Sequence, residues 1–158
     1  MARALVIGNG RLLINFDSAL NMRDLYFPHV GQLNHIGGHH NSFGVWVDDQ
    51  FSWCYEADWH RILKYKKETL VTDVKAINHR LGLQILINDA VHYRDCIYIK
   101  KMVIKNLAER EREIRVFFNH DFSIDESEVG DTAVYNPGVD AVYHYKKNNY
   151  FLANGRVR

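Results

Sequence analysis

Hydrophobic residues along this chain recur at every second position, and this alternation restricts the fold more than any other feature. The clearest run extends from Ile114 to Ile124, and shorter runs cover Leu70–Ile77, Leu83–Val91 and Ile97–Val103. No segment keeps the 3.6-residue apolar period of an amphipathic helix for three turns. Period-two alternation is typical of strands that bury one face. The sequence therefore predicts an all-β protein.

Turn-forming residues separate these runs. Three such turns are expected at Asn78–Gly82, Asn136–Gly138 and Lys146–Asn149, because their residue types favour turns. Val45–Val47 and Phe51–Trp53 are expected to form a hairpin about Asp48-Asp49, whose register the sequence leaves open. Short strands with turns about every 8–12 residues are typical of an antiparallel β-sandwich. We therefore expect residues 1–158 to form one β-sandwich domain.

Composition and charge exclude several classes of function. Hydrophobic residues make up 47% of the 158 residues and charged residues 25%, as in globular proteins. A net charge of +1 provides no broad field for nucleic acid or an anionic membrane. No apolar run approaches the roughly 20 residues that span a bilayer.

Gly8, Asn9 and Gly10 interrupt the apolar N-terminal run, and Cys54 and Cys96 lack CxxC spacing. A cytoplasmic protein with reduced thiols is expected.

The sequence offers no convincing cofactor or metal site. Gly8-x-Gly10 lacks the third glycine and the following helix of a dinucleotide-binding motif. Four histidines, His29, His35, His39 and His40, lie close together in the sequence. They have neither helical spacing nor a nearby cysteine, so structural hydrogen bonds are favoured over metal ligation. We expect no cofactor and no bound metal.

The stretch from Asn21 to Trp53 is the best candidate for a working surface, since it combines these histidines with Arg23-Asp24, glycines and aromatic residues in an irregular segment. Among the aromatic residues, Trp46 and Trp53 are expected in the core. Trp59 and Tyr26 are left open between core packing and a platform for sugar rings. Adjacent carboxylates elsewhere do not suggest an acid–base pair, which normally converges across a cleft.

Several segments carry a family resemblance. They are MARALVIGNGRLLINFD, NMRDLYFPHVGQLNH, FGVWVDDQFSW, TLVTDV, NDAVHYRD, NLAEREREIRVFFNHDF, GDTAVYNP and YFLANGR. In this order they resemble the start of prokaryotic glucoamylase-type glycoside hydrolases, glycoside hydrolase family 15, which includes glucoamylases, glucodextranases and certain trehalases. The resemblance implies an N-terminal super-sandwich followed by an (α/α)6 barrel. In that family two barrel glutamates, an acid and a base, hydrolyse α-glucosidic bonds with inversion.

The same resemblance implies which parts this chain lacks. The sequence ends at Arg158, before the family's sandwich is complete and before its barrel, so no residue here corresponds to a catalytic glutamate. The chain alone is expected to be inactive, with the catalytic (α/α)6 domain as its partner and α-glucan or oligosaccharide reached through that partner. Asp49 departs from the glycine expected in this turn, and Cys54 and Cys96 are not family features.

Five residues are candidates for the substrate cleft or the domain interface: Arg23, Asp24, Tyr26, His29 and Trp59. Arg23 offers a planar fork of donors, Asp24 accepts from such donors, and Tyr26 adds a ring with a polar tip. The competing interpretation is that Arg23 and Asp24 pair with each other or with the backbone and fix the loop.

A freestanding carbohydrate-binding module, using aromatics around Trp59 and Tyr26, is the alternative function. Calorimetry with maltodextrins separates the two functions, because a module binds sugar by itself and a companion domain binds almost none. A sandwich cut partway also leaves strand edges unpaired. We therefore expect a homo-oligomer, a two-fold dimer formed through these edges.

Overall fold

Antiparallel strands account for the fold of residues 3–127 and 129–157, which the computed structural model describes. In chain order the elements are β1 (Leu5–Gly8), β2 (Leu13–Phe16), β3 (Met22–Tyr26), β4 (Ser42–Val47), β5 (Gln50–Trp53), β6 (Trp59–Tyr65), β7 (Thr72–Asn78), β8 (Leu83–Val91), β9 (Tyr98–Asn106), β10 (Ile114–Asn119), the 3-10 turn η1 (Ile124–Glu126), β11 (Thr132–Asn136), β12 (Ala141–Lys146) and β13 (Asn149–Ala153). The prediction of an all-β protein is confirmed. No helix in these residues is long and apolar enough to cross a membrane.

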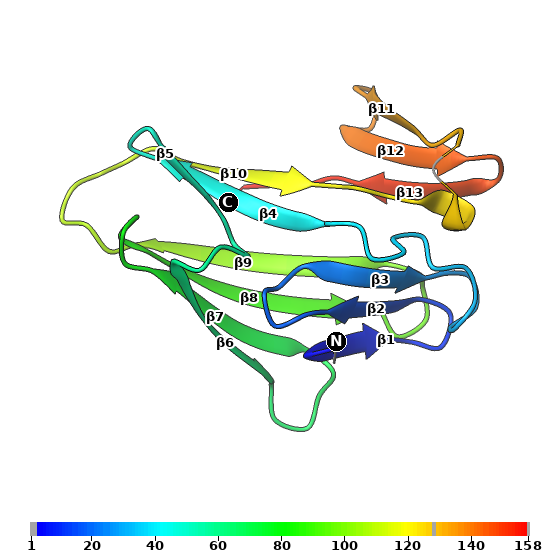
Figure 1. Ribbon diagram of the computed structural model, residues 1–158, viewed down its shortest axis with the longest axis horizontal. Coiled ribbons are helices and arrows are strands. Elements are labelled where there is room, and N and C mark those ends of the chain that lie inside the picture. The colour runs from blue at the N-terminus through cyan, green and yellow to red at the C-terminus, as the bar shows by residue number, and fades with distance from the viewer. Residues whose placement is uncertain (1–2, 128, 158) are drawn as a thin grey trace.

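The strands form sheets with the orders β1-β2-β3, β10-β4-β5, β6-β7-β8-β9 and β11-β12-β13. Every pairing within them is antiparallel. Figure 1 shows the β10-β4-β5 sheet as a layer above the β6–β9 sheet, with β1–β3 beside them and β11–β13 at one end. This layering is the expected antiparallel sandwich.

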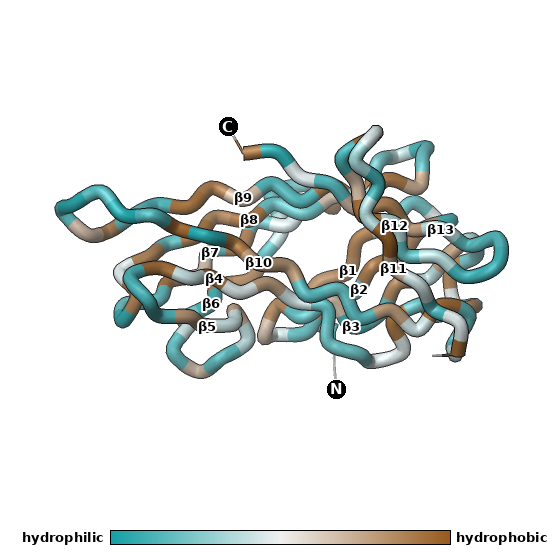
Figure 2. The backbone as a smooth tube through the Cα atoms, turned by 90° about the horizontal axis from the view of Figure 1, so that it is seen from above, coloured by the Kyte–Doolittle hydropathy of each residue, from teal (hydrophilic) through white to brown (hydrophobic). Residues whose placement is uncertain are grey.

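One hydrophobic core holds these layers together. Leu83, Ile85 and Ile87 of β8 are at most 1% exposed, and they share a buried cluster with Val45 of β4 and Ile14 of β2. Each such side chain contributes about 1.5–3 kcal/mol by leaving water. In Figure 2 the hydrophobic colour follows the strands, while the connections at both long ends are mostly hydrophilic. The predicted alternation therefore builds the core directly.

The hairpin about Asp48-Asp49 forms with a two-residue turn. Val47 pairs with Gln50, and both aspartates have positive φ, 51° and 58°. Positive φ at both central positions defines a type I′ turn, which matches the twist of antiparallel strands. Arg110 and Arg112 bind the Asp48 carboxylate at 2.7 and 3.2 Å. The structure thus decides the register that the sequence leaves open.

The placement of the tryptophans in this hairpin differs from the sequence prediction. Trp46 pairs with Phe51, and Trp53 pairs with Gly44, on the outer face of the β10-β4-β5 sheet. Their neighbours Val45 and Ser52 point inward and are fully buried. Because side chains alternate between faces, the inward register of Val45 leaves the outer face to Trp46. The prediction that Trp46 and Trp53 lie in the core is therefore wrong.

Two of the alternating runs also differ in detail from their prediction. Ile97, Ile99 and Val103 share one face in and beside β9, but that face points outward and the three are 48–51% exposed. The run from Ile114 is a strand only as far as Asn119, after which the chain turns into η1.

The β11-β12-β13 sheet packs on the rest of the molecule with one face. From that face, the Phe151 ring contacts the rings of Phe122 and His35, with centroid distances of 5.1 and 4.9 Å. Lys146 is 7% exposed and donates hydrogen bonds to the carbonyl oxygens of Ile124 and Ser127, at 2.7 and 2.5 Å. The opposite face of the sheet is left exposed.

Candidate functional site

The Asp24 carboxylate is the centre of the candidate site. It lies on β3 and is 6% exposed. Arg3 donates to both of its oxygens, through Nε to Oδ2 and through Nη2 to Oδ1, the latter at 3.0 Å. Asn15 Nδ2 donates to Oδ2 at 3.1 Å, and Asn34 Nδ2 donates to Oδ1 at 2.8 Å. Each carboxylate oxygen therefore accepts two hydrogen bonds, and Asp24 is held as an anion by its surroundings.

The pKa of Asp24 reflects these contacts. Burial raises the pKa of a carboxyl group, but the hydrogen bonds from Arg3, Asn15 and Asn34 and the charge of Arg3 lower it. The net pKa lies below the ordinary value. A general acid at neutral pH requires a raised pKa. Asp24 therefore suits a structural or orienting role and not proton transfer.

Asn34 organises the loop that follows β3. Its Oδ1 accepts hydrogen bonds from the backbone N–H groups of Leu25, Ile36 and Gly37 at 3.1–3.2 Å. Its own backbone N–H donates to Glu126 Oε1 at 2.9 Å. The loop closes at Gly37 and Gly38, whose φ values of 59° and 90° favour glycine. Asn34 thus links β3 and the loop through its side chain and η1 through its backbone N–H.

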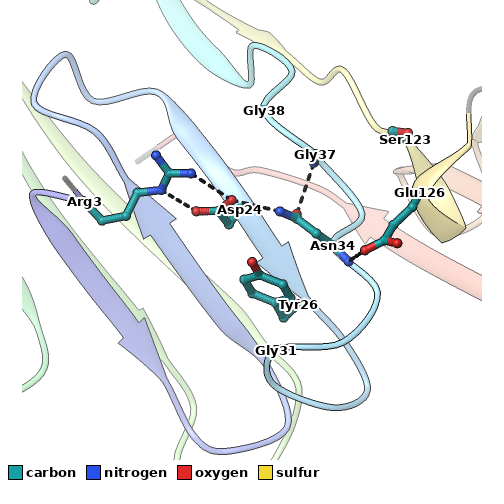
Figure 3. A pocket seen from close by; sticks show the side chains of 9 residues that line it. All are labelled: Arg3, Asp24, Tyr26, Gly31, Asn34, Gly37, Gly38, Ser123 and Glu126. Carbon is teal, nitrogen blue, oxygen red and sulfur yellow. Dashed lines mark hydrogen bonds and ion pairs between the residues drawn. The ribbon is translucent and has the colours of Figure 1, made fainter. Parts of the chain in front are cut away.

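A pocket of about 530 Å³ lies over this network. Figure 3 shows Arg3, Asp24, Asn34 and Glu126 in one row, each hydrogen-bonded to the next, with the Tyr26 ring beside the row. The other lining residues are Gly31, Gly37, Gly38 and Ser123. Volumes of 300–1,000 Å³ are typical of ligand pockets. The lining offers hydroxyl, amide, guanidinium and carboxylate groups, which suit a ligand or protein segment rich in hydrogen-bonding groups.

The four candidate residues in or near β3 occupy different positions. Asp24 and Tyr26 line the pocket. Arg23 is half-buried and is not part of the pocket lining, although its Nη2 lies 3.4 Å from the point where a Cβ on the lining residue Gly38 would sit. Asp24 pairs with Arg3 and not with Arg23, because adjacent strand residues point to opposite faces. His29 is exposed outside the lining, and its carbonyl accepts from Gln32 N–H at 3.1 Å.

Trp59 is a core residue and not a surface platform. It is 3% exposed, and its Nε1 donates to Ser52 Oγ at 2.9 Å. Neither a sugar nor an adjoining domain reaches a ring buried in this way. The candidate role of Trp59 is therefore corrected: β6 begins at Trp59 and directs its side chain into the sandwich.

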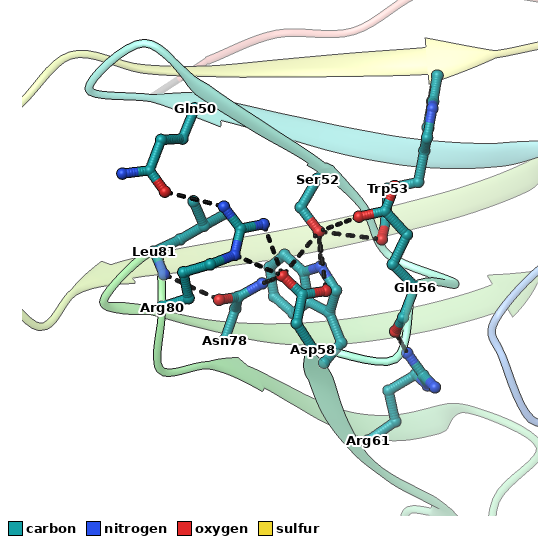
Figure 4. A network of polar contacts seen from close by, with 10 residues as sticks. Gln50, Ser52, Trp53, Glu56, Asp58, Arg61, Asn78, Arg80 and Leu81 are labelled. Atoms are coloured by element: carbon teal, nitrogen blue, oxygen red, sulfur yellow. Dashed lines mark hydrogen bonds and ion pairs between the residues drawn. The ribbon is translucent and has the colours of Figure 1, made fainter.

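The network around Ser52 and Asp58 explains why Trp59 is fixed (Figure 4). Asp58 accepts hydrogen bonds from Ser52 Oγ at 3.0 Å, Asn78 Nδ2 at 2.8 Å and Arg80 Nη2 at 2.7 Å. Burial raises the pKa of Asp58, while Arg80, Asn78 and Ser52 lower it, and the net pKa is below the ordinary value. The network joins the turns after β5 and β7, and this role is structural.

Two histidines of the cluster, His35 and His39, make contacts that indicate a structural role. His35 is fully buried, its Nδ1 accepts from Asp125 N–H at 3.1 Å, and its Nε2 contacts the Phe27 carbonyl oxygen at 2.7 Å. This pattern fits the tautomer with the proton on Nε2. His39 Nδ1 lies 3.0 Å from Asp121 Oδ1. Among residues 3–127 and 129–157, no group of three His, Cys, Asp or Glu side chains is placed to hold a metal ion.

Arg3, Asn34 and Glu126 line the pocket although the sequence analysis did not select them. A local signal exists for Asn34, because an asparagine side chain commonly accepts from the backbone N–H two residues on, which is that of Ile36 here. Arg3 and Glu126 lie 21 and 92 residues from the partners that they contact. Only the tertiary fold brings them to the site.

Comparison with known proteins gives one informative similarity. The chain is 25% identical over 127 residues to an uncharacterized glycosyl hydrolase of the archaeon Methanocaldococcus jannaschii. The aligned segment covers 80% of this chain but only 20% of that protein. No protein family matches the chain, and no solved structure matches it. The similarity and the fold together support a β-rich domain related to glycoside hydrolases.

Proposed function

We propose that this chain is the non-catalytic N-terminal β-sandwich domain of a glucoamylase-type glycoside hydrolase. In this role the Asp24 pocket faces the catalytic (α/α)6 domain and shapes its substrate cleft. The similarity to a glycosyl hydrolase five times longer than the aligned segment supports this function, as do the segments that resemble the glucoamylase-type family. The observation that carries the proposal is the open polar pocket on an irregular loop, supported by a rigid sandwich.

A supporting role suits the chemistry of the pocket better than catalysis does. An inverting glycosidase needs a carboxylic acid and a carboxylate about 6.5–9.5 Å apart, with a water between them. Asp24 accepts four hydrogen bonds and has a lowered pKa, so it lacks the properties of the acid. The bond-breaking pair is assigned to the catalytic domain of the parent hydrolase.

The domain contributes to that reaction through the fixed shape of the loop. Asn34 accepts three backbone hydrogen bonds, and Tyr26 presents its half-buried ring to the pocket. A rigid wall of this kind excludes bulk water from a neighbouring cleft and positions the substrate. Arg23, whose guanidinium lies beside Gly38, supplies donors for sugar hydroxyls or for a carboxylate of the adjoining domain.

The test uses a full-length hydrolase that carries this domain. Arg23→Ala is expected to lower kcat/KM on maltooligosaccharides by about tenfold, the effect of losing roughly 1.4 kcal/mol of transition-state stabilisation. Tyr93→Ala is the matched surface control, since Tyr93 is 71% exposed and outside the pocket lining. Unchanged kcat and KM, with an unchanged melting temperature, would rule out the cleft role of Arg23.

The isolated chain provides two further tests of this function. It is expected to release no glucose from starch, dextran or trehalose. It is also expected to self-associate as a two-fold dimer, because β9 forms an edge of its sheet and exposes Ile99 and Val103 beside that edge. Light scattering at high concentration measures the mass, and a strictly monomeric chain contradicts the dimer.

We also propose that the parent hydrolase is cytoplasmic. Cys54 and Cys96 are free thiols in the structure, and free thiols are common in reducing compartments. Burial raises the pKa of the Cys54 thiol to about 12, so this side chain behaves as a small core residue. Fractionation of the source cells tests the location, and enzyme found only outside the cells would contradict it.

A further inference from the structure

A second pocket, of about 420 Å³, lies on the outer face of the β11-β12-β13 sheet. Its lining consists of Val134, Tyr135, Asn136, Pro137, Tyr143, Tyr145 and Tyr150. Tyr143 is paired with Val134 of β11, and Tyr145 is paired with Tyr150 of β13. These residues alternate with His144 and Phe151, whose side chains contact the rest of the molecule. The sheet therefore packs with one face and presents tyrosines on the other.

The lining of this tyrosine pocket is aromatic and uncharged. The rings of Tyr145 and Tyr150 are nearly parallel, 13° apart, with centroids separated by 5.6 Å. Tyr135 donates its hydroxyl to Asp140 at 2.8 Å. Within the described residues, the hydroxyls of Tyr143, Tyr145 and Tyr150 have no hydrogen-bond partner. The pocket thus combines flat ring faces with hydroxyl groups that are available to a ligand.

We propose that the tyrosine pocket binds an α-glucan oligosaccharide. The C–H faces of sugar rings pack on flat aromatic surfaces, and sugar hydroxyls both donate to and accept from phenol groups. A charged ligand would find no ion-pair partner in this lining. An apolar ligand would desolvate three phenol groups without replacing their hydrogen bonds, which costs about 1–3 kcal/mol for each group.

The identity of the sugar as an α-glucan rests on the function proposed above, whereas the preference for a neutral, hydroxyl-rich ligand rests on the pocket alone. Sugar binding at this site also makes two functions compatible: a companion domain of a hydrolase and a carbohydrate-binding module. A companion domain that holds a glucan chain at its surface raises the local concentration of substrate near the catalytic domain. Sugar binding by the isolated chain then no longer separates the alternatives, and the residues responsible for binding become decisive.

A second exposed aromatic surface provides an internal control. It lies on the outer face of the β10-β4-β5 sheet and contains Trp46, Phe51, Trp53, Tyr55 and Phe117. Here Phe51 contacts Trp53 and Phe117 edge-on, with centroid distances of 4.9 and 5.8 Å, and Trp53 stacks on Tyr55 at 6.1 Å. Arg115 covers the Trp46 ring at 4.8 Å. Neither of the two pockets described above is lined by this surface.

Isothermal titration calorimetry of the 158-residue chain with maltoheptaose tests the site. Tyr150→Ala is expected to weaken binding at least about tenfold, and Tyr150→Phe, which keeps the ring, about two- to fivefold, since tenfold corresponds to roughly 1.4 kcal/mol. Trp53→Ala is expected to leave the affinity unchanged. Tyr143→Phe is a second pocket variant that keeps the packing of its ring, and far-ultraviolet circular dichroism verifies the fold of each variant.

Two results would overturn the site: no heat of binding at millimolar maltoheptaose, or a loss of affinity in Trp53→Ala with none in Tyr150→Ala. Neither result affects the cleft-shaping role, which depends on the kinetics of the Arg23 variant. Conversely, glucose release by the isolated chain would refute the non-catalytic function and leave sugar binding at Tyr150 intact.

Discussion

The Asp24 pocket and the tyrosine pocket differ in how completely their polar groups are paired. Around Asp24, both carboxylate oxygens and the Asn34 side chain are hydrogen-bonded to other parts of the chain. In the tyrosine pocket, three phenol groups have no partner among the described residues. Paired polar groups fix the shape of a loop, whereas unpaired groups are available to a ligand. The Asp24 pocket therefore has a fixed shape that suits a cleft-shaping role, and the tyrosine pocket suits ligand binding.

The largest effect on stability is expected at Asp24. Asp24→Ala removes the carboxylate to which Arg3, Asn15 and Asn34 donate and is expected to lower the free energy of unfolding by about 2–3 kcal/mol. Urea denaturation followed by tryptophan fluorescence measures this change. A loss below about 0.5 kcal/mol, the usual range of a surface substitution, would mean that the hydrogen bonds to Asp24 do not stabilise the pocket.

Asn34→Ala tests the loop itself. Three backbone N–H groups lose their acceptor. The free energy of unfolding is expected to fall by about 1–2 kcal/mol, because water replaces part of the lost hydrogen bonding. Amide hydrogen exchange of residues 27–41 is expected to rise in this variant. Asn148→Ala is the matched control, since Asn148 is exposed in the turn between β12 and β13. Equal exchange in both variants would show that Asn34 does not organise the loop.

The acid response separates the His120–His144 pair from the Asp24 network. His120 Nδ1 and His144 Nε2 lie 3.1 Å apart. Burial lowers the pKa of both side chains, and the charge of His144 further lowers the pKa of His120. Below about pH 6.5, the ordinary histidine value, the unfolded chain binds protons that the folded chain resists, so stability falls as the pH falls.

The denaturation midpoint is therefore expected to fall between pH 8 and pH 5, and His144→Gln is expected to reduce that fall. An identical pH dependence in the variant would contradict the role of the pair. The Asp24 network responds at lower pH. Its stabilisation is complete above about pH 4, the ordinary aspartate value, and is lost as the pH falls through the lowered pKa of Asp24.

The smallest effect on stability is expected in the tyrosine pocket. Tyr150 is 55% exposed, and its cross-strand contact with Tyr145 contributes about 0.5 kcal/mol. Tyr150→Ala is thus expected to change the free energy of unfolding by no more than about 0.5 kcal/mol. A loss comparable to that of Asp24→Ala would identify Tyr150 as a packing residue and would weaken the contrast between the two pockets.

The strands were predictable from sequence, but the contacts at the site were only partly so. The alternation in Leu83–Val91 identifies β8, and its inward residues form the core. The sequence selects Asp24 and Tyr26 because it predicts an irregular segment from Asn21 to Trp53; both residues in fact lie on β3, and both line the pocket. The Arg3–Asp24 pair was not predictable, because it depends on the tertiary approach of two distant segments.

The tryptophans show a second limit of sequence analysis. Composition alone does not decide which face of a strand is buried, because a shift of one residue exchanges the two faces. The inward register of Val45 and Ser52 places Trp46 and Trp53 outside. The buried hydroxyl of Ser52, in turn, accepts the indole N–H of Trp59 and holds it inside.

The most direct test of this account compares Tyr26→Ala with Tyr150→Ala in a full-length hydrolase that carries the domain, with maltose as substrate. The account predicts that Tyr26→Ala lowers kcat/KM by about tenfold with little change in melting temperature, while Tyr150→Ala leaves kcat/KM unchanged. An unchanged kcat/KM in the Tyr26 variant, with its fold intact, would contradict the claim that this pocket shapes the substrate cleft.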